Sequence, residues 1–244
     1  MSDSAPNPFI KKILATAGPT PLPPRVSSVM AEPVQYHRDP AFVETYQRVL
    51  ERVGYAFQTE NDVLLFTSTG SGAMESAVYN LVRPGQKVLA CATGKFGERW
   101  IQLLDSVCAD MVRYEPGWGV RIDPNEVDRL LTENPGCEVV FATLSETSTG
   151  IVHDVRAIAE IAHRHGALIV VDAVSGLAAA EMYQDDWGID VVVSGSQKAL
   201  MAPPGVGLAS VNAAALERAE SQSGGRYYFD WTRTAKAQRK SPPA

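Results

Sequence analysis

The sequence is poor in cysteine, and this shortage limits the compartments and folds that it fits. Only three cysteines occur among 244 residues. Cys91, Cys108 and Cys137 form an odd and widely spaced set, which argues against a disulfide framework and favours a reducing compartment. We therefore expect a cytoplasmic protein.

The sequence also lacks an excess of positive charge, long apolar runs and clustered histidines. Its formal net charge is -6, so we expect neither nucleic acid nor an anionic membrane as a partner. No apolar run approaches a membrane span, and the start, MSDSAPNPFIKK, lacks the apolar stretch of a signal peptide. His163 and His165 stand two residues apart in a helical pattern and so face different directions, and we predict no metal site.

The N-terminal part of the sequence is rich in proline and serine. Residues 1–38, with TAGPTPLPPRV at 16–26, predict an extended arm rather than a helix or a strand. Asp39 and Pro40 then open a helical pattern, because proline is favoured at the first helical position. This change of pattern places a domain boundary at residue 39.

From residue 62 onward, apolar runs alternate with amphipathic stretches. The runs predict seven strands at 62–66, 87–92, 111–114, 138–144, 167–174, 190–195 and 206–211. The stretches between them predict helices at 72–82, 96–107, 123–133 and 154–166. Strands that are apolar on both faces and separated by helices indicate a mostly parallel seven-stranded sheet with helices on both faces. We predict one large α/β domain over residues 39–222.

The last residues, 223–244, carry a cluster of aromatic side chains that needs a surface to bury against. The cluster comprises Tyr227, Tyr228, Phe229 and Trp231. We interpret this segment as the start of a further, truncated C-terminal region.

Polar residues that could perform chemistry follow several of the predicted strands, where ligands bind in open α/β sheets. Lys198 stands in VVVSGSQKALMAPPG, in a loop stiffened by Pro203 and Pro204. A solvated loop lysine is the ordinary alternative. Asp172 ends the run ALIVVD, where a carboxylate is costly to desolvate and needs a cation, a metal or a capping role.

Three further motifs fall at strand ends. TSTGSGAMES (67–76) joins a strand to a helix, and its backbone N–H groups with the Thr69 and Ser71 hydroxyls could hold a phosphate. The alternative is that the glycines only make room for the chain to turn from strand to helix. Thr147 and Ser148 could contact a ligand or serve turn chemistry. Phe96 could pack in the core or stack on a planar ligand.

Together these features match the needs of pyridoxal phosphate. The lysine forms a Schiff base with the aldehyde, and the carboxylate keeps the pyridine nitrogen protonated so that the ring accepts electrons. The motif TSTGSGAMES has no lysine of the P-loop kind, which makes a nucleotide a minor alternative.

The sequence resembles the class V aminotransferases of fold-type I, and more narrowly the serine–pyruvate, alanine–glyoxylate and serine–glyoxylate aminotransferases. SGSQKALMAPPG resembles the cofactor-lysine signature, and STGSGAMES, GKFGERW, SETSTG and VVDAVSG follow in the family's order. The resemblance implies the large domain of the fold-type I transferases, pyridoxal phosphate as cofactor, and a homodimer. It also implies a C-terminal domain that this sequence does not contain, with the arginine that binds the substrate carboxylate, so we expect an incomplete substrate site.

Carried over by position, the resemblance makes Lys198 the Schiff-base lysine and Asp172 the partner of the pyridine nitrogen. It places the segment Gly18-Pro19-Thr20 near the substrate. The other implied cofactor contacts are Thr69, Gly70, Ser71, Phe96, Thr147, Val174 and Gln197.

The implied reaction is transamination between a small amino acid, serine or alanine, and a 2-oxo acid such as glyoxylate or pyruvate. Lys198 would move a proton as general base and then general acid. Two alternatives stay open. A cysteine desulfurase or related lyase shares the fold but has histidine immediately before the lysine, where this sequence has Gln197. A non-catalytic fragment of an aminotransferase is the other.

Overall fold

The computed structural model describes residues 14–222 and 225–240. Its helices are α1 Pro24–Met30, α2 Pro40–Phe57, α3 Gly70–Leu81, α4 Lys95–Ser106, α5 Pro124–Glu133, α6 Val155–Arg164, α7 Ala213–Ser221 and α8 Trp231–Gln238. Its strands are β1 Asp62–Thr67, β2 Lys87–Cys91, β3 Asp110–Tyr114, β4 Val139–Thr143, β5 Ser145–Glu146, β6 Ile151–Val152, β7 Leu168–Asp172, β8 Val191–Gly195 and β9 Val206–Val211.

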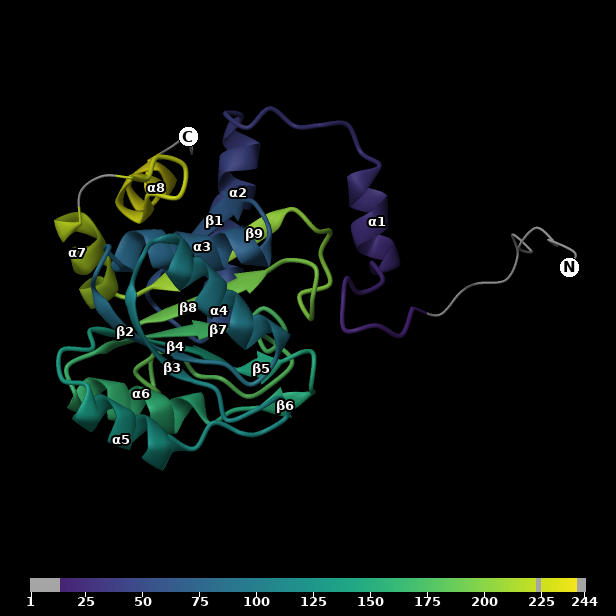
Figure 1. Ribbon diagram of the computed structural model, residues 1–244. Coiled ribbons are helices and arrows are strands. Elements are labelled where there is room, and N and C mark those ends of the chain that lie inside the picture. Colours follow the sequence, from purple (N-terminus) through teal and green to yellow (C-terminus); the bar gives the residue numbers. More distant parts are fainter. Residues whose placement is uncertain (1–13, 223–224, 241–244) are drawn as a thin grey trace, which may run out of the picture.

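Seven strands form one twisted sheet in the order β1-β9-β8-β7-β4-β2-β3 (Figure 1). The neighbours from β3 to β8 are parallel, whereas β9 runs antiparallel to both β8 and β1. The seven predicted strands and the mostly parallel sheet are therefore confirmed. β5 and β6 make a small separate hairpin just beyond β4.

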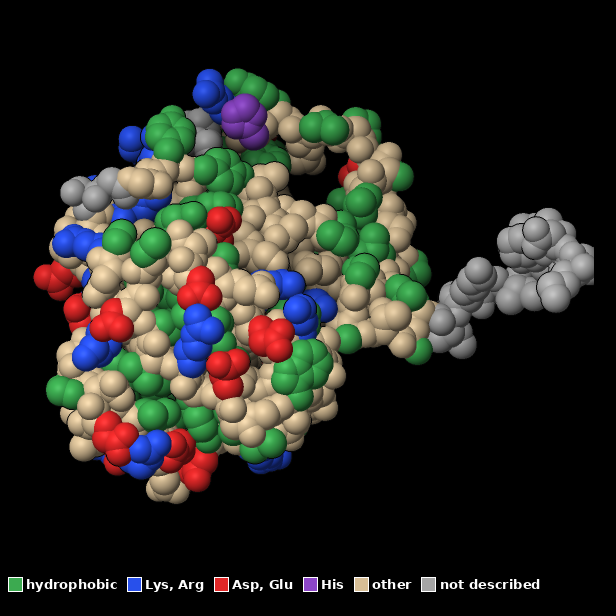
Figure 2. All heavy atoms as spheres, viewed as in Figure 1, with side chains coloured by type: hydrophobic (Ala, Val, Ile, Leu, Met, Phe, Trp, Pro, Cys, Tyr) green, Lys and Arg blue, Asp and Glu red, His purple; other side chains and the backbone are tan. Residues whose placement is uncertain are grey.

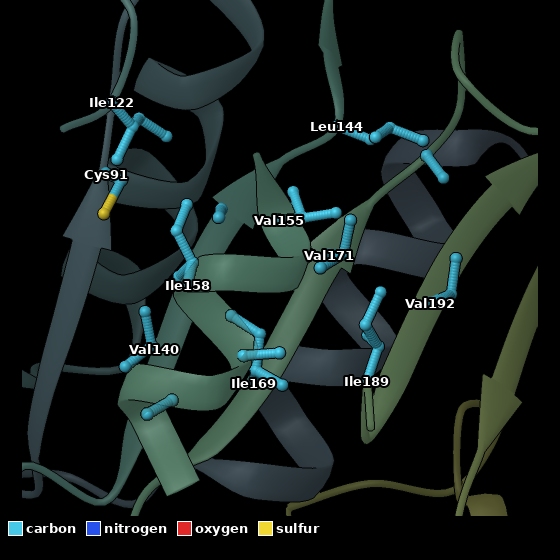
Figure 3. Packing of buried hydrophobic residues seen from close by; sticks show 14 of the residues in the cluster. Cys91, Ile122, Val140, Leu144, Val155, Ile158, Ile169, Val171, Ile189 and Val192 are labelled. Atoms are coloured by element: carbon cyan, nitrogen blue, oxygen red, sulfur yellow. The ribbon is translucent and has the colours of Figure 1, made fainter. Parts of the chain in front are cut away.

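The central strands are buried on both faces because helices cover both sides of the sheet. Figure 1 shows α5 and α6 on one side, and α3, α4, α7 and α8 on the other. Along β4 the side chains alternate between the two cores, with Val140 in the α6-side core and Phe141 in the α3-side core. Figure 3 shows the α6-side core, where Ile158 of α6 packs over Ile169 of β7.

Most helices begin at a side chain that accepts a backbone N–H from the first turn. Asp39, Thr69, Asp123, Asp154, Asn212 and Asp230 act as these N-caps. Such caps satisfy donors that a helix start leaves without an intrahelical partner. Within the described residues, none of these helices combines the length and the hydropathy needed to cross a bilayer.

The prediction of an arm without helix is wrong at residues 24–30, where α1 forms. Pro24 is at the first helical position, where a missing N–H costs nothing, and the sequence analysis treated the prolines only as breakers. α1 buries none of its residues and stands away from the sheet in Figure 1. Residues 1–13 of the predicted arm lie outside the described residues.

The aromatic cluster near the C-terminus packs against α3 and β1 through Trp231 and Phe229. Trp231 is fully buried, and its indole N–H donates to Ser76 Oγ at 3.1 Å. Asn80 donates to the Phe229 carbonyl at 2.6 Å and accepts the Trp231 N–H at 3.2 Å. Residues 225–240 therefore pack on the sheet domain, whereas residues 223–224 and 241–244 of that predicted region lie outside the described residues.

Replacing Trp231 with alanine removes a large buried side chain and leaves the Ser76 hydroxyl without its donor. We expect Trp231→Ala to lower the free energy of unfolding by about 3–5 kcal/mol in urea titrations. Tyr227→Ala is the matched control, because that aromatic side chain of the same segment is 72% exposed and should change stability little. Equal effects of the two substitutions would contradict the anchoring role of Trp231.

Candidate active site

Lys198 lies three residues beyond the end of β8, in a loop with many internal hydrogen bonds. Ser196 N–H donates to the Val206 carbonyl at 3.0 Å, and Ser196 Oγ donates to the Pro203 carbonyl at 2.6 Å. The Lys198 carbonyl accepts the Met201 N–H at 2.9 Å. The lysine is thus held by a rigid turn and is only partly exposed.

A segment far away in the sequence lies directly on Lys198. Lys198 Nζ donates to the Ala17 carbonyl at 3.2 Å, and Thr20 Oγ1 donates to the Lys198 carbonyl at 3.0 Å. Gly18 is so close that a Cβ atom there would lie 2.5 Å from Lys198 Cδ. Gly18 has a φ of 133°, which residues other than glycine rarely adopt, so glycine is required here and residues 17–20 form one wall around Lys198. That Gly18-Pro19-Thr20 lies near the substrate stays a prediction.

Asp172 ends β7 with its carboxylate almost completely buried, at 2% exposure. Burial raises the pKa of this carboxyl from its ordinary value to about 7, while the hydrogen bond from Val174 N–H, at 2.8 Å, favours the charged form. The charge of Glu146 also raises this pKa, and the charges of Arg99 and Lys198 lower it. Asp172 therefore caps the turn that follows and also carries a carboxylate in need of a further cation.

Burial lowers the pKa of Lys198 below its ordinary value, against the effect of the Asp172 charge, which raises it. The Arg99 charge adds to the lowering. A larger fraction of the Lys198 amine is therefore neutral near pH 7 than for a solvated lysine, as a nucleophile or a general base requires.

The start of α3 forms the cradle predicted from TSTGSGAMES. Thr69 caps the helix by accepting the Gly72 N–H at 3.3 Å, which leaves the N–H groups of Gly70 and Ser71 in the first turn without an intrahelical acceptor. Gly70 packs on Val174, where a Cβ atom would lie 2.7 Å from Val174 Cγ2. Such a glycine helix start presents N–H groups to an anion.

The side chain of Gln197, which precedes Lys198 in the loop after β8, lies near the start of α3. A Cβ atom on Gly195 would lie 3.0 Å from Gln197 Oε1 and 3.3 Å from Gly70 N. Gln197 Oε1 is buried and has no hydrogen-bond partner among the described residues. A buried acceptor without a partner is costly, so this oxygen calls for a group that donates a hydrogen bond.

Glu146, which the sequence analysis did not single out, fixes the position of α4. Its buried carboxylate accepts the N–H groups of Phe96 and Gly97 at the start of that helix, both at 3.0 Å. Its other oxygen accepts the Ser148 N–H at 3.1 Å and the Ser148 hydroxyl at 2.6 Å. An acidic residue between serine and threonine after a core strand was the available signal for this role.

Phe96 and Thr147 stand at the side of the cradle. Phe96 is half-buried and faces the Arg99 guanidinium, whose Cζ lies 4.9 Å from its ring centroid. Arg99 Nη1 donates to Ser71 Oγ at 2.8 Å, which ties this group to the start of α3. Thr147 exchanges a hydrogen bond with Ser175, the neighbour of Val174.

The predicted site residues therefore form one connected group. Val174 joins Asp172 to Gly70, and Arg99 joins Phe96 to Ser71. Gln197, the neighbour of Lys198 in the sequence, and Gly70 both lie beside Gly195. Sequence reasoning missed Glu146 and Arg99, since both act through contacts between segments far apart along the chain.

The raised pKa of Asp172 makes the stability of the ligand-free protein depend on pH. The folded state, with a pKa of about 7, holds this proton more tightly than the unfolded chain, whose ordinary pKa is 3.8. Its contribution to stability is thus lost as the pH rises through about 7. Asp172→Asn removes this loss, so we expect the Tm of the variant minus that of the wild type to increase from about pH 5 to about pH 8.

The control for this titration is Asp105→Asn, at an exposed carboxylate that pairs with Arg113. We expect a Tm difference for that variant which does not increase over the same pH range. A Tm difference for Asp172→Asn that stays constant or decreases would contradict the raised pKa.

Comparisons with known proteins agree with this geometry. The chain matches the family model "Aminotransferase class-V" over residues 13–244. The "soluble hydrogenase 42 kDa subunit" of Anabaena cylindrica is 37% identical over 234 residues, which cover 95% of this chain and 61% of that protein. The L-aspartate–glyoxylate aminotransferase of Paracoccus denitrificans is 36% identical over 218 residues, which cover 87% of this chain and 55% of that protein.

Among solved structures, an alanine–glyoxylate aminotransferase from Nostoc sp. superimposes with a TM-score of 0.89 at 28% sequence identity, over 97% of this chain and 63% of that one. The chain thus spans less than two thirds of the length of each of these proteins. With a family match over nearly its whole length and this fold, the chain belongs to the class-V aminotransferase family.

Proposed function

We propose that this protein transfers an amino group from a small amino acid of the serine or alanine type to a 2-oxo acid such as glyoxylate or pyruvate, with pyridoxal phosphate as cofactor. The observation that carries the proposal is the placement of Lys198, in the loop after β8, within electrostatic range of the buried carboxylate Asp172, beside a glycine helix start. A lysine, a carboxylate and an anion cradle are the groups that this cofactor needs from a protein.

The residues present fit pyridoxal phosphate. The N–H groups of Gly70 and Ser71, with the hydroxyls of Thr69 and Ser71, offer donors to a phosphate. The side chain of Gln197 lies at the same helix start, where its NH₂ group, and not its unpartnered oxygen, would donate to the phosphate. The buried Asp172 carboxylate suits a protonated pyridine nitrogen, which would supply the cation that its burial calls for.

The remaining contacts would surround the ring. Val174 would cover one ring face, Phe96 would stack on the other, and Thr147 would lie near the ring hydroxyl. Lys198 would hold the aldehyde carbon covalently in the resting enzyme. When bound, pyridoxal phosphate supplies an aldehyde that condenses with amines and a protonated ring that draws electrons away from the α carbon of an amino acid.

The catalytic work of the chain itself falls to Lys198. With an amino acid bound, the Lys198 amine would take the proton from the α carbon as general base and, as general acid, would give a proton to the former aldehyde carbon, which keeps the amino group. The lowered pKa of Lys198 favours the neutral amine that the first of these steps requires. Asp172 would be held in its ionised form by the positive charge of a protonated pyridine nitrogen, which offsets the burial that raises its pKa.

The substrate assignment rests on what is shared by the relatives. The names of two of the proteins compared above include glyoxylate, whereas their amino donors differ, with aspartate in one and alanine in the other. We propose glyoxylate as the acceptor and a small amino acid as the donor, in two half-reactions with ping-pong kinetics. Gln197, in place of histidine before the lysine, favours transamination over a desulfurase reaction.

We further propose that the protein works as a cytoplasmic homodimer. The arm around α1 exposes apolar side chains that a monomer would leave in water, Val29 at 64%, Val34 at 100% and Tyr36 at 62%. Figure 2 shows apolar side chains gathered along this arm, apart from the body of the molecule. A second copy of the chain would cover them.

The test is the visible absorption spectrum of the chain with added pyridoxal phosphate. We expect an absorption band that borohydride removes, with the cofactor attached to the peptide that contains Lys198 in mass spectra. Lys198→Ala should give neither the band nor the attachment. Arg156→Ala, on the exposed face of α6, is the control and should give both.

The same preparation tests the reaction. We expect serine or alanine to bleach the visible band and glyoxylate to restore it with formation of glycine. If the wild-type chain gives only the spectrum of free cofactor, the proposed function fails for this chain. If it binds the cofactor and none of serine, alanine and aspartate bleaches the band, cofactor binding stands and transamination of these donors does not.

A further inference from the structure

Arg99 is a partly buried cation that belongs to none of the predicted cofactor contacts. It lies in the second turn of α4, where its Nη1 donates to Ser71 Oγ at 2.8 Å and its Cζ lies 4.9 Å from the centroid of the Phe96 ring. No carboxylate in residues 14–222 and 225–240 comes within ion-pair distance of its guanidinium. A half-buried guanidinium without a counter-ion is unusual, because lost hydration is normally balanced by a carboxylate.

The hydrogen bond to Ser71 determines what the serine hydroxyl can do. A guanidinium has five donors and no acceptor, so Ser71 Oγ must accept from Arg99. The single hydroxyl hydrogen of Ser71 then remains free to donate, and it has no acceptor in the part of the chain that the structure describes. Arg99 thus turns Ser71 into a donor at the start of α3, beside the free N–H groups of Gly70 and Ser71.

The position of Arg99 is itself well supported. Glu146 accepts the second and third N–H groups of α4, from Phe96 and Gly97, and so fixes the helix that carries both Phe96 and Arg99. A Cβ atom on Gly97 would lie 2.6 Å from Ala92 Cα, which shows how closely α4 approaches β2. The guanidinium therefore reaches the start of α3 from a rigid element.

We propose that Arg99 is a positioning residue for the cofactor phosphate, which orients the Ser71 hydroxyl toward the anion, supplies the positive charge behind it and holds the Phe96 ring in place. This inference rests on the proposed function. It adds a phosphate determinant that lies outside the glycine turn and reaches it from a different helix. The Arg99 charge also lowers the pKa values of Lys198 and Asp172, which places it within electrostatic range of both groups.

The experiment compares pyridoxal phosphate with pyridoxal, which lacks only the phosphate. Dissociation constants are measured from the visible band and, independently, from quenching of the protein's tryptophan fluorescence. We expect Arg99→Met to weaken pyridoxal phosphate about tenfold or more and pyridoxal less than about twofold, since charge-assisted hydrogen bonds to an anion are the strong ones. Arg99→Lys, which keeps the charge and one donor, should recover part of the loss.

Ser71→Ala and the double variant show whether Arg99 acts through the serine. We expect Ser71→Ala to give the same selective loss, and the double variant to lose much less than the sum of the two single effects, because both substitutions remove one shared interaction. Arg113→Met is the matched control: that arginine pairs with Asp105 on the exposed side of β3, and its loss should leave both dissociation constants unchanged.

The possible outcomes separate this inference from the proposed function. A wild-type chain that binds no pyridoxal phosphate contradicts both. Tight binding by the wild type, with Arg99→Met weakening both ligands equally or neither, contradicts the role of Arg99 alone. Full additivity of Arg99→Met and Ser71→Ala contradicts the route through Ser71.

Discussion

Burial of the Asp172 carboxylate at the end of β7 is the constraint on which the rest of the site depends. Strands that are apolar on both faces create a dry sheet interior, and the last residue of such a strand is desolvated even when it is acidic. Asp172 responds with a pKa raised to about 7, because the charges of Lys198 and Arg99 only partly offset its burial. A site of this kind stabilises a ligand cation at that position.

The surrounding architecture brings three separate segments to this carboxylate. The turn after β8 carries Lys198, the start of α3 carries the anion cradle, and α4, held by Glu146, carries Phe96 and Arg99. The segment at residues 17–20 closes the site over the lysine. The parallel order of β4, β7 and β8 is what places the ends of these strands at one edge of the sheet.

The sequence predicted the sheet well because its signal is local. Each of the seven strands is an apolar run. Asp172 is the last residue of β7, and Lys198 and the glycine turn follow their strands within a few residues. α1 was missed because its prolines were interpreted only as helix breakers. α8 was missed because its burial depends on Trp231, which packs on α3, more than 150 positions away in the sequence.

The roles of Glu146 and Arg99 were out of reach of the sequence for a related reason. Glu146 accepts hydrogen bonds from N–H groups about fifty residues earlier in the sequence, and Arg99 donates to a hydroxyl 28 residues earlier. No periodic pattern in the sequence predicts either contact. Thr147 and Phe96 were identified by their positions after strands, whereas their partners, Ser175 and Arg99, emerged only from the structure. Motifs therefore identified the candidate site, and long-range hydrogen bonds explain how its residues are held.

The most direct test of the central claim is the ¹⁵N NMR chemical shift of pyridoxal phosphate labelled at its ring nitrogen and bound to this chain. We expect the shift of a protonated pyridine nitrogen in the wild type well above neutral pH, and the shift of an unprotonated one in Asp172→Asn. An unprotonated nitrogen in the wild type, with Asp172 intact, would contradict the claim that this buried carboxylate is built to pair with the cofactor.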